Sequence, residues 1–509
     1  MEEVAAAHSA TMDRSRSDRF LEETEGGPRT LRRSDTAVDL YHPFTKTVSP
    51  RDASEAQFDQ SVYRVPHLRD LADNVGRFPS PLATAVATRS LGRSFVPETE
   101  TILADIMSKK DAETVSREYL RGGPREYTAF HPKSVKAAIV TCGGLCPGIN
   151  TVIRELYMTL TAMYGVEEVY GVRMGYRGFY SPELSLVRLT SDWVSDIHHR
   201  GGSVLGSSRG GFDLEMIVSA IAAYGFRHVY IIGGDGTQRG AQAIFEECCQ
   251  RRMCVSVVGI PKTIDNDIAI IDNSFGFVTA VEEAQRAIRA AHVEAISGYH
   301  GIGLVRLMGR HSGYISMFAT LASGDVDVCL IPEIEFDLAG DCGLLSHIER
   351  LLDTKGHCVI VVAEGAGLSQ MLRDDDDADE AHDASGNVKL PNVGIWLSEE
   401  IKRHFRARGR EINLKYLDPS YEIRSVPPVA TDTIMCTLLA QSAVHGAMAG
   451  YTGFICGVVN THHVMIPLRE IVRKGRTRVD LSSRMWHRVL ASTLQPPLRN
   501  QSPRKEHDK

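Results

Sequence analysis

The sequence predicts an α/β protein with mainly parallel sheets. Short apolar runs typical of buried strands alternate with longer helical patterns along most of its 509 residues. Loops rich in glycine or polar residues follow these runs repeatedly, and in open parallel sheets ligands bind at the carboxyl ends of the strands. The order is plainest where strands at 229–232 and 255–260 flank a helical pattern from Thr237 to Gln250. We therefore expect the loops after these two strands to meet at one edge of a sheet.

The length and composition indicate at least two hydrophobic cores. Hydrophobic residues make up 43% of the chain, and its length suggests two to four domains. The net charge of −7 argues against bulk affinity for nucleic acid or an anionic membrane. The N-terminus is acidic, unlike a secretory signal, and no apolar run approaches the roughly 18 residues of a membrane span. We expect a cytoplasmic protein, with no nucleic-acid or membrane partner, whose ten cysteines remain thiols.

The first of the two loops, Gly-Gly-Asp-Gly at 233–236, has the residue types of a phosphate site. Glycine lacks a Cβ and lets a bulky anion approach the backbone, while a helix starting near Thr237 directs free N–H groups at that anion. Asp235 repels phosphate, but a bridging cation such as Mg²⁺ removes the conflict. A tight strand-to-helix turn with an aspartate cap is an equally simple interpretation of these four residues.

The second loop contains Thr263, Asp265, Asn266 and Asp267, which is too polar for a turn that only reverses the chain. One of its carboxylates is suited to accept a substrate proton, and the other is suited to position a hydroxyl. A phosphate site beside a general base is typical of phosphoryl transfer.

The N-terminal part of the chain differs from the rest. Residues 1 to about 60 are dominated by Ser, Arg, Glu and Thr, so we expect them to be disordered. The mixed, proline-containing stretch from Tyr63 to Phe130 is interpreted as an extended arm with short helices. The acidic run that begins at Asp374 lacks the ligand spacing of a calcium loop and is expected to be solvated.

The regular elements beyond this arm follow from apolar runs and from apolar residues at helical spacing. Further strands are predicted at 135–141, 169–172, 302–307, 328–331, 359–362, about 412–417 and 454–458. Further helices are predicted up to Leu160, at 279–291, up to Leu321, at 393–406 and at 431–448. The strand at 454–458 is expected to complete the regular part of the chain.

Basic residues recur in the loops that follow strands. Arg209 stands in a Gly/Ser loop, where a guanidinium can clamp a phosphate, although a surface arginine is the simpler alternative. Lys262, Arg310 and Arg424 occupy comparable positions. Four cations exceed what one phosphate needs, so we expect two phosphorylated ligands, a nucleotide and a phosphorylated acceptor.

Five motifs together resemble the 6-phosphofructokinase family. They are GGDGT at 233–237, PKTIDNDI at 261–268, MGRHSG at 308–313, the glycine turn at 143–148 and YEIR at 421–424. Their order and spacing match the family over roughly residues 134 to 470, and the wording DPSYEIRS resembles its ATP-using plant branch.

The resemblance implies two Rossmann-like three-layer domains with the active site in the cleft between them. The nucleotide-binding domain would comprise 134–277 and about 425–475, and the sugar-phosphate-binding domain 278–424 and about 476–500, after an N-terminal extension at 1–133. It further implies an allosteric enzyme of glycolysis that forms a homo-oligomer, either a dimer or a tetramer. The implied reaction is Mg²⁺-dependent transfer of the γ-phosphoryl of ATP to fructose 6-phosphate.

The resemblance also assigns roles residue by residue. Asp265 matches the proton acceptor and Asp235 the Mg²⁺ ligand. The positions that match ATP-binding residues are Gly143, Arg209, Gly210, Gly234, Asp235, Gly236 and Thr237. The positions that match sugar-phosphate-binding residues are Thr263, Ile264, Asp265, Met308, Gly309, Arg310, Glu364, Tyr421, Glu422, Ile423 and Arg424.

Some positions depart from the family pattern. Leu145 and Gly301 replace an aspartate and an inter-subunit arginine of the bacterial members. Gly236 is the ATP-type residue, because an aspartate there would occupy the space of the α-phosphate, whereas Lys262 resembles the pyrophosphate-using branch. A pyrophosphate-dependent enzyme and a non-catalytic regulatory subunit of the same fold are therefore the alternatives. A dinucleotide-dependent oxidoreductase is disfavoured, since no G-x-G-x-x-G with a following acidic residue is present. A lipid or NAD kinase shares only the GGDG turn.

Overall fold

The computed structural model describes residues 63–72, 75–83, 95–106, 117–374 and 390–499, which belong to one compact unit, Phe44–Lys509. The predicted disorder of residues 1–60 and the acidic run beyond Asp374 lie outside the described residues. Within the described ranges, no helix combines the length and the apolar character needed to cross a membrane.

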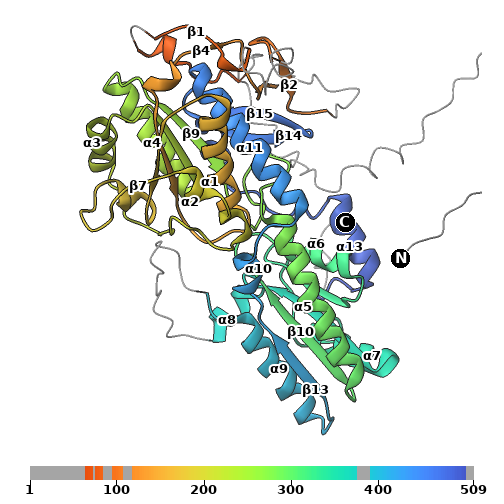
Figure 1. The fold of residues 1–509 in the computed structure, drawn as a ribbon. Coiled ribbons are helices and arrows are strands. Elements are labelled where there is room, and N and C mark those ends of the chain that lie inside the picture. The colour runs from red at the N-terminus through yellow and green to blue at the C-terminus, as the bar shows by residue number, and fades with distance from the viewer. Residues whose placement is uncertain (1–62, 73–74, 84–94, 107–116, 375–389, 500–509) are drawn as a thin grey trace, which may run out of the picture. The chain divides into compact units, whose positions relative to one another are not determined.

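A nine-stranded sheet with the order β2-β3-β15-β14-β9-β8-β5-β6-β7 carries the glycine-rich loops (Figure 1). Its strands are β2 (Thr101–Leu103), β3 (Glu118–Arg121), β5 (Lys136–Thr141), β6 (Glu168–Val172), β7 (Val187–Arg188), β8 (His228–Gly233), β9 (Ser256–Pro261), β14 (Phe454–Val459) and β15 (His462–Pro467). The five central strands, from β14 through β9, β8 and β5 to β6, pair with one another in parallel. The loops after β5, β8 and β9 therefore open at the same edge, as predicted.

Helices cover both faces of this sheet, because successive side chains of a strand point to opposite faces. Tyr230 and Ile232 of β8 pack in the same cluster as α1 (Ile149–Met158) and α11 (Ala430–Ala449). Val229 and Ile231 pack instead with α3 (Leu214–Tyr224) and α4 (Asp235–Gln250). The result is a helix–sheet–helix sandwich, in agreement with the predicted α/β class.

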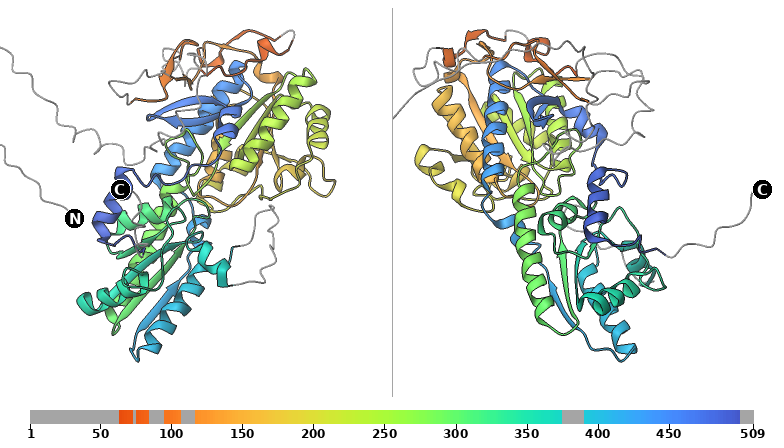
Figure 2. Two further views of the ribbon diagram at one scale, coloured as in Figure 1. Left: turned by 180° about the vertical axis from the view of Figure 1, so that it is seen from behind. Right: turned by 90° about the vertical axis from the view of Figure 1, so that its right-hand side faces the viewer.

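A second, four-stranded parallel sheet has the order β11-β12-β10-β13. Its strands are β10 (Gly301–Leu307), β11 (Val328–Leu330), β12 (His357–Ala363) and β13 (Asn413–Leu417). Helices α5 (Phe277–Ser297) and α6 (Tyr314–Ser323) pack on one face, and α7 (Leu344–Lys355) and α9 (Val393–Ala407) on the other. The long helix α5, drawn in green, runs alongside this sheet in two further views (Figure 2).

The prediction that β14 completes the regular part is wrong. Strand β15 follows in an antiparallel hairpin, and Asn460 and Thr461 turn the chain between them with positive φ. Helices α12 (Leu468–Lys474) and α13 (Arg484–Thr493) come after β15. The sequence pattern also missed α3 and α7.

The arm predicted from Tyr63 to Phe130 is more regular than expected. Strand β3 pairs antiparallel with β15, and β2 pairs with β3, so the arm extends the nine-stranded sheet. The remaining short elements are β1 (Phe78–Pro79), β4 (Tyr127–Thr128), α2 (Ser191–Val194), α8 (Leu368–Asp374) and α10 (Glu422–Ser425). A local pattern could not reveal these two strands, because β3 pairs with β15, which is distant in the sequence, and β2 pairs with β3.

Candidate active site

The turn between β8 and α4 has the geometry expected of an anion site. Helix α4 begins at Asp235 with Gly234 as its N-cap, so its first free N–H groups lie at the end of β8. Gly233 is required for steric reasons, because a Cβ there would lie 2.4 Å from the side chain of Thr237. Gly236 is exposed, and a Cβ there would meet no atom of the described residues within 4 Å. The first turn of α4 therefore has open space beside Gly236.

Asp235 is buried and lies beside two arginines. Arg239 of the same helix forms an ion pair with its carboxylate. Arg476, which follows α12, places its Nε 3.7 Å from Asp235 Oδ2 and 3.8 Å from Asp267 Oδ2. The backbone of this segment is fixed as well, since the Thr477 N–H donates to Asp267 O at 2.8 Å. Arg476 thus connects the carboxylates that follow β8 and β9.

The loop after β9 is held by its own hydrogen bonds. The Thr263 hydroxyl donates to Asp267 Oδ1 at 3.0 Å and accepts the Asp265 N–H at 3.1 Å. Asn266 adopts a positive φ of 52° and accepts the Ser274 N–H through Oδ1 at 3.0 Å. These bonds hold the backbone of the loop that carries Asp265.

Asp265 has an unusual environment for a carboxylate. Its Oδ1 is buried and has no hydrogen-bond partner among the described residues. Burial raises the pKa of Asp265 to about 8, together with the nearby carboxylates of Asp267 and Glu364, while Arg476 and Lys262 oppose the shift. A carboxylate with a pKa close to neutral and an unpaired oxygen is suited to accept a proton.

Three cations gather at the turn that follows β5. The buried Lys262 donates through Nζ to Gly144 O at 2.6 Å. A Cβ on Gly144 would lie 3.5 Å from Arg209 Nη2 and 3.6 Å from Arg424 Nη1, and a Cβ on Gly143 would lie 3.6 Å from Lys262 Nζ. Burial lowers the pKa of Lys262, and the other two cations lower it further. Three like charges beside bare backbone form a site for a multiply charged anion.

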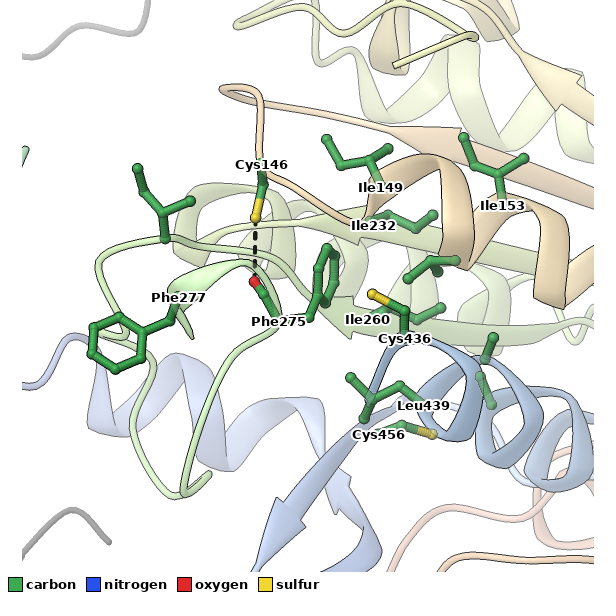
Figure 3. Packing of buried hydrophobic residues seen from close by; sticks show 14 of the residues in the cluster. Cys146, Ile149, Ile153, Ile232, Ile260, Phe275, Phe277, Cys436, Leu439 and Cys456 are labelled. Carbon is green, nitrogen blue, oxygen red and sulfur yellow. Dashed lines mark hydrogen bonds between the residues drawn. The ribbon is translucent and has the colours of Figure 1, made fainter. Parts of the chain in front are cut away.

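The turn after β5 and the loop after β9 are packed against each other. Cys146 donates through Sγ to Phe275 O at 3.2 Å, above a core that includes Ile232 and Ile260 (Figure 3). Lys262 forms a parallel β-bridge with Phe275, which ties the start of the loop to the same point. This packing keeps the cations and Asp265 in a fixed relation.

The loops of the four-stranded sheet approach the same region. The Ser312 hydroxyl donates to Asp265 O at 3.3 Å. Gly365 N–H donates to Gly309 O at 3.2 Å, and a Cβ on Gly365 would lie 2.1 Å from Arg310 O. Glu364 is half-buried, and burial raises its pKa against the opposing effect of nearby arginines. The MGRHSG loop and Glu364 therefore lie next to the loop that contains Asp265.

The residues predicted to bind the sugar phosphate differ in how far they are exposed. Tyr421 and Glu422 are exposed, and the Arg424 guanidinium lies over the Tyr421 ring at 5.0 Å. The side chains of Ile264 and Ile423 are buried in the hydrophobic core, so only their backbone is available to a ligand. Among the other predicted positions, Met308 is half-buried against the core, Thr237 is buried, and Arg209 and Gly210 are exposed.

Three site residues escaped the sequence analysis. Arg476 lies in a polar stretch that gives no periodic signal. Glu333 accepts the Gly313 N–H at 3.0 Å and the Val479 N–H at 2.8 Å, and so joins the MGRHSG loop to the segment of Arg476. Arg306 could have been noticed, because it is the one charged residue in the otherwise apolar run GIGLVRL.

Comparisons with known proteins agree with the geometry. Residues 136–447 match the family model described as Phosphofructokinase. The chain is 53% identical over 85% of its length to ATP-dependent 6-phosphofructokinase 7 of Arabidopsis thaliana, covering 88% of that protein. It is 45% identical over 74% of its length to ATP-dependent 6-phosphofructokinase of Borreliella burgdorferi, covering 85% of that protein.

A solved structure shares the fold. The pyrophosphate-dependent phosphofructokinase from Marinobacter aquaeolei superimposes with a TM-score of 0.59 at 21% identity, over 73% of this chain and 94% of that one. Identity at this level bears on the architecture alone.

Proposed function

This chain belongs to the phosphofructokinase family, and from that premise we propose that it phosphorylates fructose 6-phosphate with ATP. The γ-phosphoryl group passes to the 1-hydroxyl, whose proton is accepted by the enzyme, and the products are fructose 1,6-bisphosphate and ADP. This is the committed step of glycolysis. The names of the relatives at 45% and 53% identity favour ATP as the donor over pyrophosphate.

The observation that carries this proposal is the state of Asp265. Its buried Oδ1 has no partner among the described residues, and its pKa is raised to about 8 by burial and by neighbouring carboxylates. We assign it as the proton acceptor for the sugar hydroxyl. The cations Lys262, Arg209 and Arg424 are suited to offset the charge of the transferred phosphoryl group.

The residues present fit a magnesium ion. Mg²⁺ is usually held by one or two carboxylates together with substrate phosphates. The carboxylates of Asp235 and Asp267 lie within 4 Å of the same guanidinium, that of Arg476, so two oxygen ligands of the kind that Mg²⁺ takes lie near one point. We assign Asp235 as the ligand. When bound, Mg²⁺ would neutralise the donor phosphates.

The remaining contacts to the phosphoryl donor would come mainly from the backbone. The first turn of α4, at 234–237, offers N–H groups that have no partner within the helix, and Gly236 leaves room for the α-phosphate that pyrophosphate lacks. Lys262 suits the terminal phosphate of either donor, because a flexible ammonium acts as a point charge. Steric room at Gly236 is therefore the feature that selects ATP.

A coupled assay on the purified protein tests the proposal. Fructose 6-phosphate is offered with ATP and then with pyrophosphate, and we expect turnover with ATP and Mg²⁺. Turnover with pyrophosphate alone would overturn the donor assignment. No turnover with either donor would point to a non-catalytic subunit.

We also propose a cytoplasmic homo-oligomer, either a dimer or a tetramer. Light scattering of the purified chain should give a mass of at least twice the monomer's 56.0 kDa, and a monomeric mass would contradict the assembly. A fluorescent fusion should distribute through the cytoplasm, and retention in an organelle would contradict the location.

A further inference from the structure

Arg306 is a charged residue inside a buried strand. It belongs to β10, two residues before Met308, and its side chain is only 15% exposed. Burying a guanidinium is unfavourable unless it is paired and hydrogen-bonded. The contacts of Arg306 therefore indicate why the strand contains it.

The guanidinium of Arg306 connects the ends of three adjacent strands. Nη2 donates to Glu364 Oε2 at 3.2 Å, directly after β12. Nη1 donates to Asp418 Oδ2 at 2.9 Å and to Ser420 Oγ at 3.2 Å, directly after β13. One side chain thus fixes Glu364 and the start of the segment that leads to Tyr421 and Arg424.

The charges in this network depend on Arg306. Burial raises the pKa of Glu364 while Arg306 opposes the shift, and the carboxylate of Asp418 raises it further. Burial also acts on Asp418, but bonds from Ser420 and Arg306 lower its pKa overall. Without Arg306, two carboxylates would face each other in a partly buried site.

We propose that Arg306 is a positioning residue for the phosphoryl acceptor, which it serves by setting Glu364 and the Ser420–Arg424 turn in the geometry that binds the sugar phosphate. This inference rests on the proposed function. The planar fork of arginine holds two partners at once, which the single ammonium of lysine does not. The cations Arg209 and Lys262 come from the other sheet and only Arg424 is shared with it, so the effect should fall mainly on the acceptor.

The first test is Arg306→Met, which keeps the length of the side chain and removes the fork. KM for fructose 6-phosphate should rise by about tenfold to 100-fold, the range expected for lost charged hydrogen bonds, while KM for ATP stays within about twofold. The matched control is Arg410→Met. Arg410 precedes β13 of the same sheet and pairs with Asp353 instead, so both KM values should be unchanged.

The pH dependence separates positioning by charge from loosening of the fold. The pKa of Glu364 is influenced by Arg306 of β10, Arg310 of the next loop, Arg424 of α10 and Asp418 after β13, and the Glu364 carboxylate in turn raises the pKa of Asp265. Loss of Arg306 raises the pKa of Glu364, so in the Met variant KM for the sugar phosphate should increase as the pH falls from 8 to 6. Arg306→Lys should restore much of the wild-type pH dependence. A variant that was merely looser would show a similar increase at every pH.

Several results would overturn the inference. A wild-type KM for fructose 6-phosphate in Arg306→Met would do so, and so would an equal increase in KM for ATP. If circular dichroism shows that Arg306→Met does not fold, Asp418→Asn gives the same test. It keeps the shape and removes one charge, and an unchanged KM for the sugar phosphate would count against the inference.

Calorimetric titration with fructose 6-phosphate distinguishes this inference from the proposed function. A wild-type protein that binds the sugar phosphate without turnover would contradict the kinase assignment, and the two Kd values would still test Arg306. Equal Kd values for wild type and Arg306→Met would contradict the role of Arg306 alone. A wild type that binds no fructose 6-phosphate would contradict both.

Discussion

The loops of the nine-stranded sheet and those of the four-stranded sheet arrange their charges differently. After β5, β8 and β9, the site is built from glycine backbone, and three cations lie together beside Gly143 and Gly144. After β10, β12 and β13, charged side chains neutralise one another, with Arg306 between Glu364 and Asp418. In the first region three cations gather at one turn, apart from the pairing of Asp235 and Asp267 with Arg476, whereas in the second a single arginine lies between two carboxylates.

This difference indicates what each region binds. Cations gathered around Lys262 repel one another, so a polyanion such as the phosphates of a nucleotide relieves the repulsion. A balanced network gains little from added charge, but it holds Glu364 and the Tyr421 segment in fixed positions. We propose that the first region selects by charge and space, and the second by geometry.

The largest effect should come from Asp265→Asn at the junction of the two regions. The substitution keeps the shape and the contacts of the loop but removes the proton acceptor, so kcat should fall by on the order of 10² to 10⁴. Calorimetry should show that both substrates still bind, because the substitution leaves the structure of both regions unchanged. A variant with kcat near that of the wild type would remove Asp265 from this role.

Gly236→Asp tests whether the first region selects by space. The new Cβ would meet no atom of the described residues within 4 Å and φ at this position is not positive, so the variant should fold normally. Catalytic efficiency with ATP should fall by on the order of 10², the usual size of a lost positioning contact.

Two further variants at this position distinguish space from charge. Gly236→Asn has the size of the aspartate without its charge and should be equally impaired, whereas Gly236→Ala should keep most of the activity. An unchanged KM for ATP in Gly236→Asp would refute the steric argument.

Arg476→Met tests the cation between Asp235 and Asp267. Loss of its charge should lower kcat/KM by about tenfold, within the range for a charged contact. Arg476 lowers the pKa of Asp265, so removing it raises that pKa. The acidic limb of the kcat/KM profile should then shift to higher pH, because the base must be deprotonated to act. Arg478→Met, two residues further on, is the control and should leave the limb in place.

The smallest effect should be on stability. The folded-state pKa of Asp265 is about 8, well above the roughly 3.9 expected in the unfolded chain. The native state therefore binds a proton that the unfolded state has released, and the wild type loses stability as the pH rises from about 4 to about 8. Asparagine does not titrate, so Asp265→Asn should melt a few degrees higher near pH 8. The difference in Tm should narrow near pH 5, and a difference that is constant with pH would show that Asp265 has an ordinary pKa.

Much of the catalytic core could be predicted from sequence. The apolar runs at 229–232 and 255–260 sufficed to predict two parallel strands whose loops meet, because strand direction fixes where the carboxyl ends lie. The glycines of the 233–236 turn were predictable for the same local reason, since close backbone approach excludes a Cβ at Gly233. Lys262 could also be predicted as a candidate phosphate contact, because it is a basic residue in the loop that follows a predicted strand.

The parts that escaped prediction depend on contacts between distant segments. Strand β3 pairs with the antiparallel edge that β15 offers, and its four residues include too few apolar ones to be recognised alone. The role of Arg476 depends on the folded chain, because the hydrogen bond from Thr477 N–H to Asp267 O holds Arg476 beside the Asp267 carboxylate. Ile264 and Ile423 were predicted as ligand contacts from their neighbours in the motifs, whereas packing places both side chains in the core.

By itself, the sequence determined the α/β class, the order of the strand-end loops and the residue types at the reaction centre. Each of these follows from periodicity or from the local requirements of a turn. The tertiary structure alone decided which charges are paired. Arg306 and Arg476 find their carboxylates across the ends of separate strands, and the pKa of Asp265 is set by burial that no local pattern records. Electrostatic energy depends on distance and desolvation, and both are properties of the folded chain.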